Sequence, residues 1–313
     1  MKIAFVSCQN NAVLPLFREA KWQILEEFVV SFVEEEIVSR QNAGVKYAAS
    51  LLVPKHRKES GAYRFEGVKL FAEAIKCGVS LERIFIDSQR REAILSSMDA
   101  ASLSWREKTD ATVSFLSPSV FASVSEEKSP EGIICVAKAL DKSGKCDKII
   151  DKPFLMKEKI RIMAAESIRD PGNVGSIIRS ARAFGVDLLL LSSDCADVLS
   201  SKVIRSSMGA VFSLPVEVCA SLTDRLTELK GQGYRVLATA LMSDATPLSD
   251  MDVTAEDIFV IGNEGHGLSS NVISLADRCV YIDMDAGAGC ESLNAGIAFA
   301  VCAWEQRKSA GEK

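Results

Sequence analysis

Residues 166–185, ESIRDPGNVGSIIRSARAFG, determine the fold of the second half of the chain. They follow an apolar run, Ile160–Ala165, which predicts a buried strand. The DPG triplet at 170–172 predicts a turn, because proline fixes φ and glycine tolerates a positive φ. The apolar residues that come next recur on one helical face: Ile177, Ala181 and Phe184.

The predicted helix has clear signals at both ends. Asn173 is predicted as its N-cap, since an asparagine side-chain oxygen accepts from an unpaired helical N–H. Gly185 suits the helix stop, and Val186–Leu191 is predicted as the next strand. Arg179 and Arg182 lie three residues apart and are neighbours on the helix. The result is a strand–turn–helix–strand unit with polar groups at the carboxyl end of its first strand, where open α/β sheets bind ligands.

Length and composition set broad limits. A chain of 313 residues predicts about two domains. The net charge of -5 gives no general basic surface, so a nucleic-acid site must be a local patch. The nine cysteines are scattered without a CxxC, and only two histidines are present, so we expect reduced thiols and no metal site. No apolar run reaches transmembrane length and no signal segment is evident, so we expect a cytoplasmic protein.

The first half of the chain alternates predicted strands and helices, which favours an α/β domain. The predicted strands are Met1–Ser7, Glu82–Asp87, Thr112–Leu116 and Gly132–Lys138, and the predicted helices lie within Val13–Arg40, from Phe65 to Cys77, and over Arg91–Met98. The next segment is charged and lacks periodicity, which is typical of a linker. We therefore expect domains at 1–140 and 160–313, joined by a linker at 141–159.

The stretch Lys55–Arg64, KHRKESGAYR, is locally basic, with four cations against one carboxylate and a net charge of +3. Its cations are Lys55, Arg57, Lys58 and Arg64. Two interpretations remain open on charge alone. The stretch is either a solubilising loop or a set of phosphate contacts, where clustered cations release counterions on binding RNA.

A second glycine-rich segment follows a predicted strand, Ile258–Gly262. Residues 261–269, IGNEGHGLS, carry three glycines that let the backbone turn sharply and approach a ligand closely. Glu264 lies among them, either with a role in the site or as an acceptor for backbone N–H groups. His266 invites assignment as a general base, but a loop histidine is the favoured interpretation, because no carboxylate or nucleophile is tied to it by sequence.

The third segment runs from a predicted strand, Arg278–Asp283, through a loop to a final helix, Ser292–Arg307. Ser292 is predicted to cap that helix, whose free N–H groups then face a ligand. One helical face is apolar and contains Leu293, Ile297, Val301 and Trp304. Between the glycine-rich segments, strands are predicted at Leu214–Cys219 and Tyr234–Ala240, with a helix at Leu222–Lys230.

These three segments resemble the three motifs of the SpoU family of ribose 2′-O-methyltransferases, in the SPOUT class. Motif 1 is matched by Asn173, Gly175 and Arg179 with Ala183-Phe184-Gly185, motif 2 by IGNEGHGLS with Glu264, and motif 3 by SLNAGIA with Ser292 and Asn294. The segment Lys202–Pro215 is also similar to the family, as is RFEGVKLFAEAIKCGVSLERIFID to its accessory RNA-binding domain. Asp283 stands where the family usually has proline, and the loop before motif 3 is longer than the common pattern.

The resemblance implies an α/β fold with a parallel sheet, a trefoil-knotted SPOUT domain and a smaller L30e-like domain before it. It implies S-adenosylmethionine as cofactor, structured RNA (rRNA or tRNA) as substrate, and a homodimer. The implied catalytic residues are Asn173, Arg179, Glu264, Ser292 and Asn294. The implied cofactor-binding residues are Thr239, Ala240, Gly262, Ile282 and Leu293. The residues predicted to bind RNA are the four cations of the basic stretch, Lys55, Arg57, Lys58 and Arg64, together with Arg182 and Arg205.

In this family, an arginine at the position of Arg179 is proposed to assist deprotonation of the ribose 2′-hydroxyl. An arginine is effectively always protonated, so we interpret Arg179 as a phosphate clamp that stabilises alkoxide charge. Ser292 and Asn294 would orient the ribose, and Glu264 would hold Arg179 or the loop.

Two rival functions are weighed against this one. A dinucleotide dehydrogenase is disfavoured, because no GxGxxG follows a strand and opens a helix, and no P-loop is present. A catalytically inactive RNA-binding relative would keep the fold without its chemistry. The intact motif residues, Arg179, Glu264, Ser292 and Asn294, argue against it. Binding of S-adenosylmethionine distinguishes an active methyltransferase from such an RNA-binding relative, which should not bind it.

Overall fold

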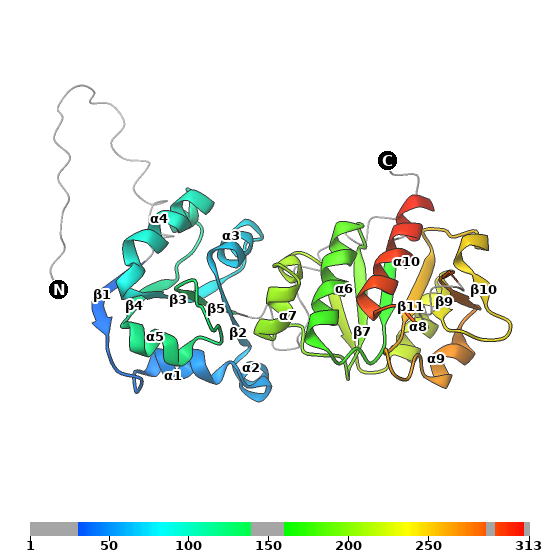
Figure 1. Cartoon of the computed structure of the whole chain (residues 1–313), viewed down its shortest axis with the longest axis horizontal. Coiled ribbons are helices and arrows are strands. Elements are labelled where there is room, and N and C mark those ends of the chain that lie inside the picture. Colours follow the sequence, from blue (N-terminus) through cyan, green and yellow to red (C-terminus); the bar gives the residue numbers. More distant parts are fainter. Residues whose placement is uncertain (1–30, 139–159, 286–291, 310–313) are drawn as a thin grey trace, which may run out of the picture.

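The computed structural model describes residues 31–138, 160–285 and 292–309. Two α/β units lie side by side, each built on its own sheet (Figure 1). The predicted strand Met1–Ser7 and the predicted linker at 141–159 lie outside the described residues.

The first unit contains a five-stranded sheet in the order β1-β4-β3-β5-β2. Its strands are β1 (Ser31–Ile37), β2 (Ala62–Glu66), β3 (Leu81–Asp87), β4 (Thr112–Leu116) and β5 (Ile133–Lys138). Strands β1, β4 and β3 are parallel, whereas β5 runs antiparallel to both β3 and β2. The predicted strands at 82–87, 112–116 and 132–138 are therefore confirmed.

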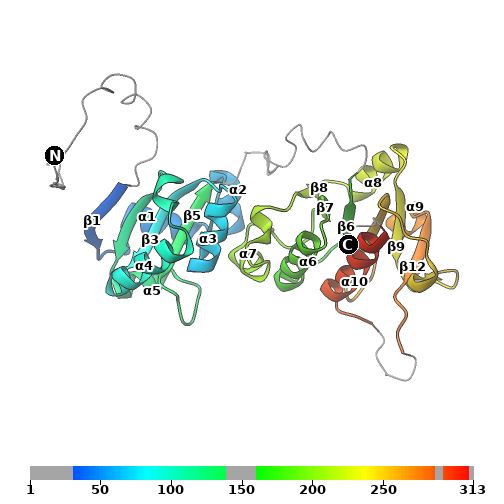
Figure 2. The ribbon, with the colours of Figure 1, turned by 90° about the horizontal axis from the view of Figure 1, so that it is seen from above.

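Helices cover both faces of this sheet (Figures 1 and 2). They are α1 (Ala43–Ser50), α2 (Pro54–Ser60), α3 (Val68–Lys76), α4 (Arg91–Ala101) and α5 (Pro118–Val124). Neighbouring strand residues point to opposite faces, so Ile84 and Ile86 pack in one core with α3 and α4, while Phe85 packs in another with α1 and α5.

The helix prediction for 13–40 is wrong at its C-terminal end. Residues 31–37 form β1, which pairs in parallel with β4 at the sheet edge, and the Phe32 ring meets Trp105 edge-on at 6.5 Å between centroids. Tertiary pairing thus overrides the local helix propensity of the glutamates.

The second unit is a seven-stranded, all-parallel sheet in the order β10-β12-β9-β11-β6-β7-β8. Its strands are β6 (Ile162–Ala165), β7 (Leu188–Ser192), β8 (Val216–Cys219), β9 (Arg235–Thr239), β10 (Thr246–Pro247), β11 (Asp257–Ile261) and β12 (Arg278–Tyr281). Its helices are α6 (Pro171–Ala183), α7 (Ser201–Ser206), α8 (Leu222–Gly231), α9 (Ser270–Leu275) and α10 (Ala295–Ser309). The parallel sheet predicted for this half is confirmed.

This sheet is buried on both faces, as parallel sheets usually are. Helices α6 and α10 pack on one face and α8 and α9 on the other (Figure 2). Near the end of α10, the buried Gln306 amide donates to the carbonyls of Ile162 at 3.1 Å and Asp257 at 2.6 Å. The C-terminal helix is thereby fixed across the centre of the sheet.

In the part of the chain that the structure describes, no helix combines the length and apolar character that crossing a membrane requires.

Candidate functional site

The N-terminus of helix α6 is capped by Asp170 and not, as predicted, by Asn173. The Asp170 carboxylate accepts from the Asn173 backbone N–H at 3.0 Å, and Pro171 occupies the first helical position. Both residue types are good caps, so sequence alone does not separate them. With Asp170 as the cap, the Asn173 side chain remains available for contacts outside its own helix.

The Asn173 side chain connects all three motif segments. Its amide nitrogen donates to the Glu264 carboxylate, and its oxygen accepts from the Asn294 amide at 2.9 Å. The first turn of α6, the loop after β11 and the residue that caps α10 therefore meet in one chain of hydrogen bonds. Glu264 was expected to hold Arg179 or its own loop; it holds Asn173 instead.

Asn294, and not Ser292, caps α10. Its side-chain oxygen accepts from the backbone N–H groups of Gly296 at 2.9 Å and Ile297 at 3.3 Å. The predicted cap was wrong because the helix begins at Ala295, which places Ser292 before the capping position. Asn294 thus caps the N-terminus of α10 with its side-chain oxygen and contacts Asn173 with its side-chain nitrogen.

Small residues allow α6 and α10 to approach each other closely. A Cβ on Gly296 would lie 3.1 Å from the Ser176 Cβ, closer than almost all real Cβ contacts. This approach brings Asn294 within reach of Asn173, so Gly296 contributes to the site although it carries no functional group.

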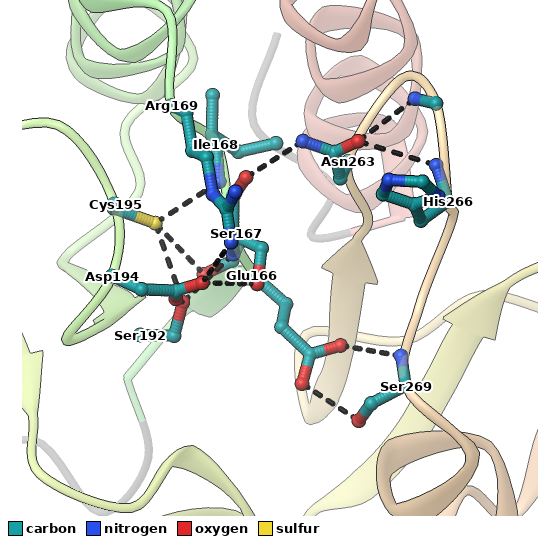
Figure 3. Close-up of polar contacts among 12 residues, drawn as sticks. Glu166, Ser167, Ile168, Arg169, Ser192, Asp194, Cys195, Asn263, His266 and Ser269 are labelled. Atoms are coloured by element: carbon teal, nitrogen blue, oxygen red, sulfur yellow. Dashed lines mark hydrogen bonds and ion pairs between the residues drawn. The ribbon is translucent and has the colours of Figure 1, made fainter.

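The loop after β11 is held by Asn263, which the sequence analysis did not select (Figure 3). Its side-chain oxygen accepts from the N–H groups of Gly265 at 2.8 Å and His266 at 3.2 Å, and its amide donates to the Ser167 carbonyl at 2.9 Å. An asparagine within a glycine-rich turn is a recognisable signal for such contacts. Because Asn263 satisfies the backbone, Glu264 is free to reach Asn173.

Two further contacts close this loop. A Cβ on Gly262 would lie 2.6 Å from the Leu268 backbone nitrogen, so only glycine fits where the loop folds back on its strand. The Glu166 carboxylate accepts from the Ser269 N–H and hydroxyl, both at 2.7 Å (Figure 3). Glu166 therefore ties the loop after β6 to the loop after β11.

Ser167 adopts a left-handed backbone, with φ of 58°, which is unusual for a residue other than glycine. Its N–H donates to the Ser192 hydroxyl and its own hydroxyl to Asp194, both at 2.7 Å (Figure 3). Hydrogen bonds from Ser192 and also from Ser167 lower the pKa of Asp194 against the opposing effect of partial burial. Arg169 lies 3.6 Å from the same carboxylate. The strained turn is thus held by a charged acceptor.

Arg179 is exposed on α6 and, among the residues that the structure describes, makes no hydrogen bond or ion pair. It lies one turn beyond Gly175, which packs against α7, and one turn before Arg182, whose guanidinium donates to the Ser213 hydroxyl at 3.0 Å. Arg179 is therefore on the side of α6 that carries Gly175 and Arg182.

Three of the residues predicted to hold the cofactor lie together at the carboxyl ends of neighbouring strands. Strands β12, β9 and β11 are neighbours, so Ala240, Gly262 and Ile282, which follow them, lie close to one another. The Thr239 hydroxyl donates to the Val260 carbonyl at 2.9 Å, and the Ala240 N–H to the Val280 carbonyl at 3.0 Å.

Three large apolar side chains near these strand ends are exposed: Leu241, Met242 and Met284. Exposed apolar side chains at strand ends suit a ligand with a flat apolar part, such as an adenosyl group. Within residues 31–138, 160–285 and 292–309, no cluster of three or more metal-binding side chains occurs.

Two of the predicted RNA-binding cations are buried, which corrects that prediction. Arg64 is 1% exposed and pairs with Glu66, and Arg57 is 6% exposed and pairs with Asp197 at 2.6 Å. Buried guanidinium groups need such partners and are not available to phosphates. Lys55 and Lys58 remain exposed on α2.

The apolar face of α10 that contains Ile297 and Trp304 points outward. Ile297 is 55% and Trp304 51% exposed, whereas Phe299 and Cys302 are buried. A groove of about 460 Å³ follows this face and is also lined by Phe184 of the α6 C-cap, whose ring meets Trp304 edge-on at 5.8 Å. Such an exposed apolar groove is a recognised sign of an interface.

Comparison with known proteins identifies both halves of the chain. The SpoU rRNA methylase family matches residues 160–304, and the MRM3-like substrate binding domain matches residues 42–135. The 23S rRNA (guanosine(2553)-2′-O)-methyltransferase RlmP of Bacillus subtilis is 28% identical over 277 residues, covering 87% of this chain and 99% of that protein.

A second relative is an uncharacterised tRNA/rRNA methyltransferase of Synechocystis sp., 30% identical over 276 residues and covering 87% of this chain and 93% of that protein. Among solved structures, the AdoMet-bound rRNA methyltransferase from Sinorhizobium meliloti superposes with a TM-score of 0.69. It covers 88% of this chain and 97% of its own at 24% identity, a likeness of fold.

Proposed function

This chain belongs to the SpoU rRNA methylase family, and from that premise we propose that it methylates a ribose 2′-OH of rRNA or tRNA with S-adenosylmethionine. The observation that carries the proposal is the chain of hydrogen bonds from Asn294 through Asn173 to Glu264. It joins the polar residues of three separate motif segments beside the strand ends where parallel α/β sheets bind ligands.

The cofactor, when bound, supplies a methyl group made electrophilic by its sulfonium, and the transfer needs no metal for that activation. Backbone around Ala240, Gly262, Ile282 and Leu293 would hold it, with the Thr239 hydroxyl bracing β9 against β11. The exposed side chains of Met242 and Met284 would cover its apolar part. Asp283, which replaces the usual proline, accepts from the Ser249 hydroxyl at 2.8 Å and so fixes the end of β12.

The remaining work of the enzyme is alignment and charge control. Ser292 and Asn294 orient the acceptor ribose, and Glu264 fixes Asn173, which in turn fixes Asn294. Arg179 clamps the neighbouring phosphate with its planar fork and stabilises charge that develops on the 2′-oxygen. Transfer of the methyl group would break its bond to the sulfur and leave a thioether, and the hydroxyl proton would pass to a phosphate oxygen or to water.

We propose that residues 1–140 form the RNA-binding domain, of L30e-like fold, and residues 160–313 the methyltransferase domain, joined at 141–159. The exposed cations Lys55 and Lys58 are available to phosphates. Arg182 and Arg205 are also exposed on the catalytic side, where Arg182 donates to Ser213 and Arg205 pairs with Glu127. RNA that reaches the catalytic edge would contact both units.

We further propose that the protein is a cytoplasmic homodimer with a trefoil knot in its catalytic domain. The groove with Ile297 and Trp304 supports the dimer, because a second copy would cover an apolar surface that one copy leaves in water. The knot is proposed from the family alone.

The test is methyl transfer from labelled S-adenosylmethionine to rRNA and tRNA isolated from cells that lack the gene, followed by mapping of the modified ribose. A 2′-O-methyl group at a defined position is expected. Binding of RNA without binding of S-adenosylmethionine would overturn the proposal and favour an inactive RNA-binding relative.

A further inference from the structure

Helix α7 lies between the two units (Figures 1 and 2). On its catalytic side it packs tightly on α6: a Cβ on Gly175 would lie 2.7 Å from the Ser206 Cβ and 2.9 Å from the Ser207 nitrogen. Such backbone contact leaves no slack, so a shift of α7 moves α6 with it. Helix α6 carries Asn173 and Arg179.

On its other side, the α7 segment is part of the first unit's core. Ile204 is fully buried within that core, and Phe212, in the short 3-10 helix η5 (Ala210–Phe212), lies 5.1 Å from the Phe65 ring and 6.4 Å from the Tyr63 ring. Gly209, with φ of 81°, turns directly against α3, and a Cβ there would lie 3.1 Å from the Glu73 Cγ. The contact is therefore a packed interface.

Arg57 and Asp197 form the central polar contact of this interface. The guanidinium donates to the Asp197 Oδ2 from Nε at 3.0 Å and from Nη2 at 2.6 Å. It also donates to the Leu51 and Leu52 carbonyls at 2.6 and 3.0 Å. Four donations from one planar group determine a single orientation of α2 relative to the loop before α7.

A second set of polar contacts holds the other end of the interface. The Ser201 hydroxyl donates to Glu126, and Arg205 pairs with Glu127 at 2.5 Å. The Glu126 backbone N–H in turn donates to Glu66, the partner of the buried Arg64. Both ends of α7 are thus fixed to the first unit.

We propose that Arg57 and Asp197 are positioning residues that select the methylated nucleotide. The pair fixes the first unit on α7, and α7 fixes α6. The distance between the RNA-binding surface of the first unit and the catalytic residues on α6 is therefore constant. A structured RNA held by both units then presents one ribose only. This inference rests on the proposed function.

The test compares Asp197→Asn and Arg57→Lys with the wild-type full chain. Asp197→Asn removes the charge but keeps the side-chain oxygen that accepts from the Leu199 N–H at 2.9 Å, so the fold is retained. Arg57→Lys keeps the charge and loses the fork. Asp224→Asn, at an exposed aspartate on α8, is the matched control.

With rRNA from cells that lack the gene, each variant should keep its KM for S-adenosylmethionine and lose about tenfold in kcat/KM for RNA. Methylation should also spread to neighbouring nucleotides, which a loss of stability alone would not cause. The double variant should be no worse than the poorer single variant, since the two residues act as one pair. Unchanged site selection, or additive losses, would overturn the proposal.

Amide hydrogen exchange tests the same interface without activity. In Asp197→Asn, exchange should quicken in α7 and in residues 51–57 and stay unchanged in α8, because only the interface is loosened. Wild-type protein that methylates no RNA would refute the proposed function, and the exchange result would still decide whether the pair fixes the two units. Equal exchange in all three segments would exclude that role.

Discussion

The Asn294 amide donates to the Asn173 side-chain oxygen at 2.9 Å, although the two residues are 121 positions apart. Asn173 in turn donates to Glu264, so each of three loops is positioned by the next. Polar groups that are fixed before the substrate arrives need no rearrangement during the reaction, which is the usual source of strong transition-state stabilisation. The first predictions concern this arrangement.

Asn294→Ser should separate helix capping from positioning. Serine is a good N-cap, so the free energy of unfolding should change little, but its hydroxyl does not reach Asn173 as the amide does. The transfer rate should fall about 10²-fold, as expected for a small misplacement of reacting groups. Asn294→Ala should in addition lose about 1 kcal/mol of stability with the cap. Thermal unfolding and single-turnover transfer measure the two effects, and a serine variant at the wild-type rate would contradict a positioning role.

Arg179→Ala should leave the fold and the affinity for S-adenosylmethionine nearly intact, because Arg179 is exposed and has no partner among the described residues. The transfer rate should fall by about 10²- to 10³-fold, since the charge acts mainly in the transition state. Arg179→Lys should recover little, because lysine lacks the planar fork. Single-turnover transfer to RNA is the measurement; a lysine variant near the wild-type rate would reduce Arg179 to a general positive charge.

Asp194 should make the loop after β6 sensitive to acid. Its pKa is lowered in the folded protein by hydrogen bonds from Ser192 and Ser167, so its stabilisation is complete above the unfolded pKa of about 3.9. That stabilisation is lost as pH falls from there through the folded pKa. Wild-type thermal stability should drop over this range, and Asp194→Asn should be less stable at neutral pH and show a shallower drop. Parallel curves for the two proteins would exclude this role.

Lys55 and Lys58 should contribute to RNA affinity through charge alone. Replacing both with alanine should weaken binding and reduce the slope of log affinity against log salt by about 2, one for each lost phosphate contact. Lys308→Ala, near the C-terminal end of α10, is the control, because it also replaces a lysine charge with alanine. An unchanged slope in the double variant would remove α2 from the RNA-binding surface.

Ile297→Lys should convert the proposed dimer to a monomer, because it places a charge in the apolar groove beside Trp304. Leu103→Lys is a matched control, since Leu103 is 89% exposed and lies in the other unit. Analytical ultracentrifugation gives the mass of each variant. A wild-type protein that sediments as a monomer at all concentrations would refute the dimer.

Most strands and helices could be predicted because their residues carry the pattern themselves, but β2 and β10 were not predicted. Thr112–Leu116 and Leu222–Lys230 were located almost to the residue. The β1 strand could not be, because its structure depends on pairing with β4, far along the chain. Propensity decides an element only where tertiary contacts do not compete with it.

The site was predictable in its residue types and not in its contacts. Asp170 and Asn173 are both good helix caps, and only geometry decides between them. Arg57 was counted as surface charge because its partner, Asp197, lies 140 residues later. Helix α10 is apolar on two sides, so the pattern could not tell that Phe299 points inward and Ile297 outward.

The separation of 121 residues between Asn173 and Asn294 has a consequence for biosynthesis. The first unit pairs its strands within residues 31–138, whereas the catalytic edge needs a residue that is translated much later. Domains fold as units during synthesis, N-terminal first, and parallel sheets of long sequence separation form slowly. The strands of the first unit can therefore pair on the growing chain before the catalytic edge is complete, so the part that performs the chemistry forms later.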